Sequence, residues 1–392
     1  MYDVVVIGAG ASGLMTALNI ENKKVLVLEK NEVCGKKLLL TGGGRCNLSN
    51  SSGKKVFLDG INDKIFFKKT YSKFNNLKLI DYFKRNGLEL KQEGEKAFLK
   101  SGKSQEIVDF FERKIFEKDN VSISLSEEVL NVEYKSSFKV FTNKRTIESK
   151  MIVIATGGVS YPSTGSTGFG HSVAKKLGHN ITNLYSAESN VFTANHGLSG
   201  QTVDVVTKFE NNTERGSMLF THKGLSGEPI LNLSHMIDEK IKQGDSEKVF
   251  IEVDFLPQEK TEKLLQKVDS NERNNFREIF QKKIPKSVLN YILGEEQFIK
   301  IAELSRNRRN SLIREIKSKK IEIKSVSGLE SSIATAGGVN LKNVCPHTFK
   351  SYINKNVFFG GEVLDLHGKV GGYNLSIAFI TGYLIAQEIN SR

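Results

Sequence analysis

The chain has 392 residues, 39% of them hydrophobic and 26% charged, and a formal net charge of +13 at pH 7. This length predicts two or three domains, and the composition is that of a soluble globular protein without the roughly eighteen consecutive apolar residues of a membrane span. Cys34, Cys46 and Cys345 have neither disulfide-framework nor metal-ligand spacing. We therefore expect no membrane partner, no metal and a reducing cytoplasm. The positive charge indicates either an anionic partner, such as nucleic acid, or a lysine-rich solvated surface.

The N-terminal thirty residues predict a dinucleotide-binding βαβ unit. Residues 2–7 read as a buried strand, and a second short strand ends at Glu29. Between them, Gly8 permits a tight turn, Gly10 lets backbone amides approach a pyrophosphate, and Gly13 allows the helix to pack closely on the sheet. The helix N-terminus favours an anion, and Glu29 is placed to accept hydrogen bonds from ribose hydroxyls. Because the chain enters a core strand at once, we expect no cleavable signal peptide.

The loop after Glu29 combines three adjacent glycines with positive charge. Residues 35–47 read GKKLLLTGGGRCN, with Lys36, Lys37 and Arg45 around the glycines. Exposed backbone amides and cations together can hold a pyrophosphate or the carbonyl edge of a bound ring. The alternative is a flexible surface loop with chance basic residues.

The rest of the N-terminal half alternates helices and short strands. Helical spacing recurs over 75–86 and 104–118, and 151–155 reads as a further buried parallel strand. Three short runs predict strands joined by turns in a small antiparallel meander: 121–125, 129–134 and 138–141.

Two further glycine clusters follow predicted strands. One spans 156–170, and the other spans 360–374 and leads into an apolar helix over 374–389. A helix start preceded by Gly-Gly can direct amides at the electron-rich edge of a ring, which in a flavin is N1 and O2. Residues 335–338 form either a purely structural turn or another turn near the ring.

Composition shifts predict an insertion within a Rossmann-type domain. Short alternating strands such as 202–209 and 249–255 give way to a charged helical stretch, after which glycine and β-branched residues return. The expected parts are the first part of the Rossmann domain at 1–185, an inserted β-rich domain at 186–256, a basic helical domain at 257–326 and the closing part of the Rossmann domain at 327–392.

Five motifs stand in order along the chain: GAGASG, TGGGRCN, ATGG with STGSTGFG, FTHKGLSG, and GGEVLDLHGKVGGYN. In these motifs the chain resembles the bacterial single-Rossmann FAD-binding family labelled aminoacetone-oxidase-like, which is related to fumarate-reductase-type flavoproteins. The resemblance covers nearly the whole chain. It implies an α/β fold, with a Rossmann-type FAD-binding domain, an inserted β-rich domain and a small helical domain, and it implies non-covalent FAD.

The expected FAD contacts all lie in these glycine-rich motifs or directly beside them. They are Gly8, Gly10, Ala11, Ser12, Gly13, Glu29, Lys30, Lys37, Gly44, Arg45, Cys46, Asn47, Thr156, Gly157, Gly361, Glu362, Asp365, Gly372, Tyr373 and Asn374. The chain departs from the family pattern at 95–99, at 187–190 and at Glu228. These positions lie outside the FAD motifs, so they bear on the substrate and not on the cofactor.

The resemblance implies hydride transfer from flavin N5 to a conjugated C=C bond. The sequence has no second G-x-G-x-x-G after a strand and no closely spaced cysteine pair, so NAD(P)H is expected to act as a transient electron donor without its own domain. Such a reduction needs a donor for the developing enolate oxygen and a proton source. The candidates are Arg45, His222 and Tyr373. Their alternative roles are phosphate binding for Arg45, a structural histidine for His222 and packing for Tyr373.

The helical stretch bears on the substrate, because Arg306, Arg308 and Arg309 begin a basic helix that could contact RNA. A merely solvated face is the alternative. The resemblance implies reduction of a uridine in ribosomal RNA to dihydrouridine, reduction of steroid enones, or oxidation of aminoketones. We favour ribosomal RNA as the substrate. A small-molecule enone reductase, an amine oxidase using oxygen, and a binding module with structural FAD stay open.

Overall fold

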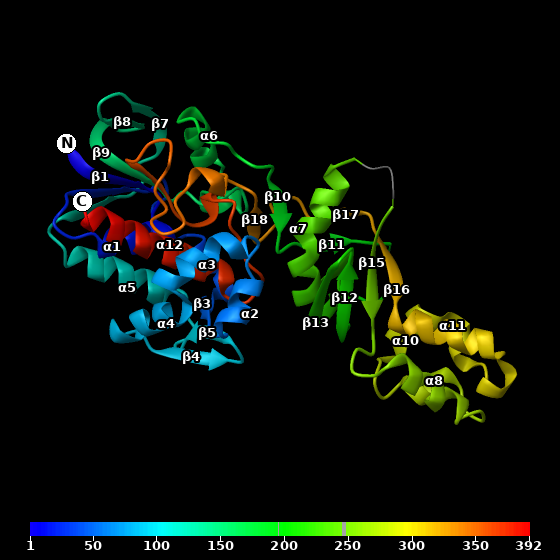
Figure 1. Cartoon of the computed structure of the whole chain (residues 1–392). Helices are drawn as coiled ribbons and strands as arrows, with labels where there is room; N and C mark the ends of the chain where they lie inside the picture. The colour runs from blue at the N-terminus through cyan, green and yellow to red at the C-terminus, as the bar shows by residue number, and fades with distance from the viewer. Residues whose placement is uncertain (195, 245–247) are drawn as a thin grey trace. The chain divides into compact units, whose positions relative to one another are not determined.

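The computed structural model describes residues 1–194, 196–244 and 248–392, which form two compact units. Unit 1 consists of Met1–Tyr185 and Ile333–Arg392, and unit 2 of Ser186–Ser332 (Figure 1). None of the helices in the described part of the chain is long and apolar enough to cross a membrane.

Unit 1 is built on a seven-stranded sheet in the order β6-β2-β1-β9-β8-β7, with β19 also paired to β9. Its strands are β1 (Tyr2–Ile7), β2 (Val25–Leu28), β6 (Val121–Ser124), β7 (Val129–Tyr134), β8 (Phe138–Thr142), β9 (Thr146–Ile154) and β19 (Val357–Phe359). The pairs β6–β2, β2–β1, β1–β9 and β9–β19 are parallel. Parallel strands covered on both faces explain the continuous apolar runs in the sequence.

The expected meander over 121–141 is wrong in one strand. Val121 pairs with Val25, so β6 joins the parallel sheet at the edge beside β2. The antiparallel part consists of β7, β8 and β9. The helix α5 (Gln105–Phe116) before β6 returns the chain across the sheet, and such a crossover places the next strand parallel to its neighbour.

The helices of unit 1 cover this sheet, and a small antiparallel sheet in the order β3-β5-β4 lies among them (Figure 1). The helices are α1 (Ala11–Asn19), α2 (Lys54–Asp59), α3 (Lys64–Lys73), α4 (Asn76–Arg85), α5 (Gln105–Phe116), α6 (Phe169–Lys176) and α12 (Tyr373–Asn390), with short 3₁₀ turns at Leu38–Gly44, Pro162–Thr164, Leu341–Asn343 and Gly361–Val363. The small sheet comprises β3 (Asn47–Asn50), β4 (Leu90–Glu93) and β5 (Lys96–Leu99).

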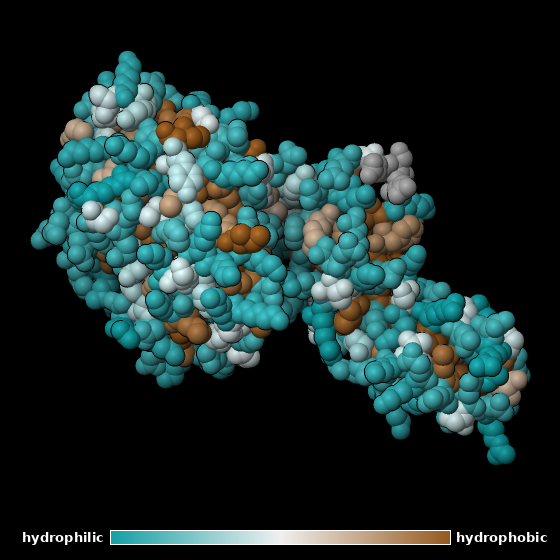
Figure 2. Space-filling view, viewed as in Figure 1, coloured by the Kyte–Doolittle hydropathy of each residue, from teal (hydrophilic) through white to brown (hydrophobic). Residues whose placement is uncertain are grey.

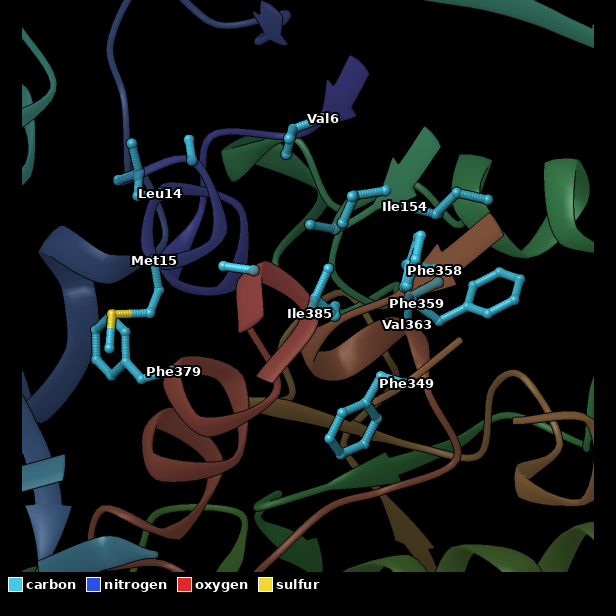
Figure 3. Close-up of a cluster of buried hydrophobic side chains, with 14 of the residues drawn as sticks. Val6, Leu14, Met15, Ile154, Phe349, Phe358, Phe359, Val363, Phe379 and Ile385 are labelled. Carbon is cyan, nitrogen blue, oxygen red and sulfur yellow. The ribbon is translucent and has the colours of Figure 1, made fainter. Parts of the chain in front are cut away.

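The first and last helices pack closely because small residues line their contact. A Cβ on Gly382 would lie 2.4 Å from the Ser12 carbonyl oxygen. Thr16 donates its hydroxyl to the carbonyl oxygens of Ser12, at 2.9 Å, and Gly382, at 3.0 Å. The core beside this contact brings Leu14 and Met15 together with residues of α12, β9 and β19 (Figure 3). The two ends of the chain are thereby joined in one core.

Unit 2 contains a seven-stranded antiparallel sheet in the order β16-β15-β12-β13-β14-β11-β17. Its strands are β11 (Val191–Phe192), β12 (Thr202–Phe209), β13 (Asn212–Phe220), β14 (Gly224–Gly227), β15 (Val249–Asp254), β16 (Lys319–Ile323) and β17 (Ser325–Val326). The helices are α7 (Glu228–Lys242), α8 (Thr261–Asp269), α9 (Phe276–Phe280), α10 (Lys286–Leu293) and α11 (Arg306–Lys317), with 3₁₀ turns at Gly294–Phe298 and Ile301–Glu303. The short strands β10 (Tyr185–Ala187) and β18 (Ala334–Ala336) stand outside this sheet.

The strands and helices of unit 2 share one core. The expected division at residue 257 runs through this unit, because β16 and β17 return to the sheet after the helices. Val205 of β12, Leu264 of α8 and Ile313 of α11 belong to one buried cluster. The segment expected to be β-rich, 186–256, also includes the fifteen-residue helix α7.

Candidate cofactor site

The glycine clusters meet at one edge of the parallel sheet in unit 1. The strands β2, β1, β9 and β19 are neighbours and run in the same direction, so their carboxyl ends lie side by side. Glu29 follows β2, Gly8 follows β1, Thr156 follows β9 by two residues and Gly361 follows β19 by two. Open parallel sheets bind ligands at this edge. The first βαβ unit and two glycine clusters that lie far from it in the sequence therefore contribute to one site.

The turn between β1 and α1 contains glycines of two kinds. Gly8 and Gly13 are required by the backbone conformation or by close packing, whereas Gly10 faces open space. A Cβ on Gly13 would lie 1.9 Å from the Gly8 carbonyl oxygen, and Gly8 itself has a φ of +103°. A Cβ on Gly10 would meet nothing within 4 Å in the part of the chain that the structure describes. No side chain of the described residues caps the first turn of α1. The amides of Ala11, Ser12 and Gly13 are thus available to a diphosphate.

Glu29 is held beside this turn. Its side chain is buried and accepts hydrogen bonds from the backbone N–H of Ala9 at 2.9 Å and from Asn31, N–H at 2.8 Å and Nδ2 at 2.7 Å. A carboxylate has about four acceptor positions and three are used here, so about one remains for a ribose hydroxyl. Lys30 reaches the 162–168 loop, since a Cβ on Gly165 would lie 3.0 Å from its Cε.

The loop before β3 turns through consecutive left-handed residues. Gly42, Gly43 and Gly44 have φ values of +60°, +65° and +83°, and Cys46 follows with +54°. A Cβ on Gly43 or Gly44 would meet nothing among the described atoms within 4 Å. Arg45 stacks on Phe98, 4.3 Å from the ring centroid, and pairs at the surface with Glu93 at 3.0 Å, so its charge already has a carboxylate partner.

Cys46 is fully buried in this loop. Burial raises the pKa of its thiol to about 12, despite a hydrogen bond with Thr41 that lowers it. The sulfur therefore keeps its proton at neutral pH and is not a thiolate nucleophile.

A polar network ties together the loops that follow β2, β9 and β19. Lys37 donates from Nζ to Ser160 Oγ at 2.6 Å and to Glu362 Oε2 at 2.7 Å. Glu362 Oε1 accepts from Ser160 Oγ at 2.9 Å and from the Thr335 backbone N–H at 2.7 Å. Lys37 and Glu362 are among the residues expected here from the sequence, whereas Ser160 is not, and Thr335 belongs to a turn for which two roles were open. The neighbouring glycines, at 157–158 and 337–338, were the signal from which Ser160 and Thr335 could have been found.

The 156–170 cluster and the turn after β19 complete the edge. Thr156 Oγ1 is buried and has no hydrogen-bond partner among the described residues, and a Cβ on Gly170 would lie 2.1 Å from it. Gly157 and Gly361 have φ values of +74° and +75°. The Gly361 N–H donates to Thr381 Oγ1 at 2.9 Å, which fixes this turn on α12.

The start of α12 is shaped by the glycines that precede it. Gly372 has a φ of +93°, and a Cβ there would lie 2.5 Å from the Ser49 carbonyl oxygen. With its amide oxygen toward α12, Asn47 accepts from the Gly372 N–H at 3.0 Å. Asn374 accepts from the Gly368 N–H at 2.8 Å and donates to its carbonyl at 3.1 Å. No side chain in the described ranges caps the helix, so its first amides can face an anion.

Two other candidates on this segment have different surroundings. The backbone of Asp365 is fixed by a bond from its N–H to Val339 O at 3.0 Å. Tyr373 is buried, with its ring stacked on Phe57 at 5.0 Å. This contact fits the packing role for Tyr373 better than a position against the substrate.

The remaining candidates lie in unit 2. His222 is exposed in the turn between β13 and β14. Arg306 is exposed at the start of α11, whereas Arg308 pairs with Glu296. Arg309 is 17% exposed and pairs with Asp269 at 2.9 Å. Two of the three arginines expected to contact RNA thus already have carboxylate partners.

The residues at this edge fit FAD. Uncapped helix starts, open glycines and a buried orphan hydroxyl leave donors available to an anionic dinucleotide, and Glu29 supplies the acceptor. No group of three or more His, Cys, Asp or Glu among the described residues could hold a metal ion. The available donors and the acceptor Glu29 make this edge a candidate cofactor site.

Comparisons with known proteins agree with this geometry. A family model described as HI0933-like protein Rossmann domain matches residues 2–388. The chain is 26% identical over 401 residues to "Ribosomal RNA dihydrouridine synthase" of Escherichia coli (strain K12), covering 99% of this chain and 98% of that protein. It is 26% identical over 424 residues to "3-dehydro-bile acid delta(4,6)-reductase" of Clostridium scindens, covering 100% of both.

A solved structure of similar fold is 3-ketosteroid delta1-dehydrogenase from Sterolibacterium denitrificans in complex with 1,4-androstadiene-3,17-dione. Its TM-score is 0.54 at 12% identity, with 100% of this chain and 99% of that chain covered. At this identity the likeness concerns the fold alone. The expected fold class, a Rossmann-type FAD-binding domain with additional antiparallel sheets and helices, is confirmed.

Proposed function

This chain belongs to the family described as HI0933-like protein Rossmann domain, and from that premise we propose that it is an FAD-dependent oxidoreductase that reduces a conjugated C=C bond. The favoured substrate is a uridine of ribosomal RNA. The observation that carries the proposal is the meeting of Glu29, after β2, with three glycine-rich turns at the carboxyl ends of β1, β9 and β19. This edge offers amide donors and one acidic acceptor, which is the donor set that a dinucleotide requires.

Each part of FAD has a matching part of the chain. The first amides of α1 suit the diphosphate and Glu29 suits the adenosine ribose, while the 42–44 loop and the start of α12 suit the polar edge of the ring system. FAD, when bound, supplies hydride transfer. The network of Lys37, Ser160 and Glu362 holds the surrounding loops in place.

The chain must also stabilise charge and deliver a proton. The uncapped amides of α12 favour negative charge beside them. Arg45 and His222 are the exposed candidates for polarising a substrate carbonyl or donating a proton. The pairing of Arg45 with Glu93 must open if its guanidinium is to reach a substrate.

The names of the relatives support reduction of a C=C bond. Dihydrouridine differs from uridine by two hydrogens across one C=C bond, and a delta(4,6)-reductase acts on conjugated C=C bonds. The net charge of +13 favours the polyanionic substrate. The bile acid reductase name supports a steroid-like enone as the second candidate.

The test is anaerobic turnover of the purified flavoprotein. NADH or NADPH is added with in vitro transcribed ribosomal RNA or with a steroid enone, and products are identified by mass spectrometry. In the proposed reaction, NAD(P)H, a proton and uridine give NAD(P)⁺ and dihydrouridine. Dihydrouridine in the RNA supports the proposal. Reduction of the enone alone selects the second candidate, and rapid peroxide formation from an amine in air selects the oxidase.

A further inference from the structure

The helical hairpin formed by α2 and α3 carries lysines that the fold leaves unpaired. We define the lysine face as Lys55, Lys68, Lys69 and Lys73. All four side chains are exposed, and no carboxylate of the described residues pairs with any of them. This segment lies outside the motifs expected to bind FAD or RNA.

Two members of the lysine face lie opposite the buried side of α3, while Lys68 lies on its flank and Lys55 belongs to α2. Phe67, Thr70 and Tyr71 are buried against unit 1, and the helical period places Lys69 and Lys73 on the far side. Ile65 lies on the same side and is 74% exposed. The lysines are therefore not needed to pack the helix.

The acids of the hairpin are engaged elsewhere. Asp59 pairs with Lys64 at 3.2 Å, and Asp63 caps α3 by accepting from the Phe66 N–H at 2.8 Å. Lys69 and Lys73 are four residues apart on one helix, and like charges at this spacing repel. Lys73 gains from the helix dipole at the C-terminal turn, but Lys69 in the middle does not. The fold thus keeps a concentration of charge that has no internal use.

The hairpin is fixed to the segment that leads into α12. Phe57 of α2 stacks on Tyr373, and the Lys369 N–H donates to the Gly60 carbonyl at 2.9 Å. The Asn62 N–H donates to the carbonyl of His367 at 3.0 Å. Unit 1 therefore holds the lysine face in a fixed position relative to the last glycine motif of the cofactor edge.

We propose that the lysine face binds the phosphate backbone of the RNA substrate. This inference rests on the proposed function and names the surface that seats its polyanionic substrate. Four free ammonium groups suit phosphates, and exposed Ile65 among them suits contact with a ribose or base. The face of unit 1 that Figure 2 shows is mostly hydrophilic with scattered apolar side chains. On α11, by contrast, Arg308 and Arg309 are already paired.

The test compares two variants that lose the same charge. One carries K55Q, K68Q, K69Q and K73Q in unit 1. The matched control carries K286Q, R314Q, K320Q and K324Q, four exposed cations of unit 2 for which no carboxylate partner occurs among the described residues. Binding of in vitro transcribed ribosomal RNA is measured over a range of salt concentrations, together with FAD content and melting temperature.

We expect the lysine-face variant to keep its FAD and melting temperature while its Kd for RNA rises at least about tenfold at low salt. A plot of the logarithm of the binding constant against the logarithm of salt concentration has a negative slope. This slope should become less steep by about 3, as expected for the loss of four phosphate contacts. The control should bind as the wild type does. Equal weakening of both variants, or weakening of the control alone, would overturn the proposal.

Two further readouts separate this proposal from the proposed function. If the lysine-face variant forms dihydrouridine as efficiently as the wild type, the proposed role of the lysine face is contradicted, while the proposed reductase activity is supported. Lysine-dependent RNA binding without any dihydrouridine supports the surface and contradicts the RNA reductase. Lysine-dependent binding to phosphatidylserine vesicles without RNA binding would assign the face to lipid and overturn the proposal.

Discussion

The sheet edge of unit 1 and the helix α11 of unit 2 are both rich in groups that suggest ligand binding, yet the fold uses them differently. At the sheet edge, Gly10, Gly43 and Gly44 face open space and the starts of α1 and α12 have no side-chain cap among the described residues. On α11, Arg308 and Arg309 pair with carboxylates of unit 2. A binding motif is therefore recognised by what the fold leaves unsatisfied and not by residue type alone.

The largest expected effects are on stability and FAD binding, and they differ between two glycines of the turn between β1 and α1. Gly13→Val should destabilise unit 1 by at least about 3 kcal/mol and abolish FAD binding, because its Cβ would meet the Gly8 carbonyl at 1.9 Å. Gly10→Val should unfold like the wild type but lose FAD, since its side chain enters only the space in front of α1. Urea unfolding and flavin absorbance check both. Retention of FAD by Gly10→Val would contradict this placement.

Acid should destabilise unit 2 through a histidine. Burial lowers the pKa of His235 from 6.5 to about 4. The unfolded chain then binds this proton below pH 6.5, while the folded chain binds it only near pH 4. The free energy of unfolding should therefore fall by about 2–3 kcal/mol as pH drops across this window. His235→Gln should remove this part of the pH dependence, and His222→Gln, at an exposed turn, should not.

The acceptor at the sheet edge should affect binding more than folding. Glu29→Gln is expected to weaken FAD affinity by about ten- to a hundredfold, because a charged acceptor of ribose hydroxyls becomes a neutral amide. Titration of the apoprotein with FAD measures this change. A mutant that binds FAD as tightly as the wild type would show that Glu29 serves only the turn.

The paired arginines of α11 should give the smallest effects, and on stability instead of RNA affinity. Arg309→Gln should cost about 1–2 kcal/mol, because its largely buried charge pairs with Asp269. Arg308→Gln should cost less stability than Arg309→Gln, since the guanidinium of Arg308 is more exposed in its pair with Glu296. RNA affinity and urea unfolding are measured for both variants. A variant that binds RNA markedly more weakly at unchanged stability would contradict the structural role of these arginines.

Apolar periodicity and glycine spacing were sufficient to predict those strands, helices and turns that show such a pattern in their own residues. The apolar run of β1, the strand β12 at 202–209 and the apolar helix α12 follow the patterns from which they were predicted. The fold class and the enzyme class, an FAD-dependent oxidoreductase, are confirmed by the family and by the fold. These features depend on period and on glycine spacing, which a single sequence displays.

Features set by tertiary neighbours could not be predicted in this way. The partner of Arg309 lies forty residues away, and the partner of Lys37 lies 325 residues away. The parallel pairing of β6 with β2 depends on the path of α5 and not on the strand's own residues. The hairpin of α2 and α3 was missed because its helices are short and its lysines obscure the apolar period.

The most direct test of the account is the FAD content of the purified protein and of its Gly10→Val variant. The account predicts a yellow wild-type protein with about one extractable FAD per chain, and a folded but colourless variant. A folded wild-type protein that is colourless and takes up no added FAD would contradict it.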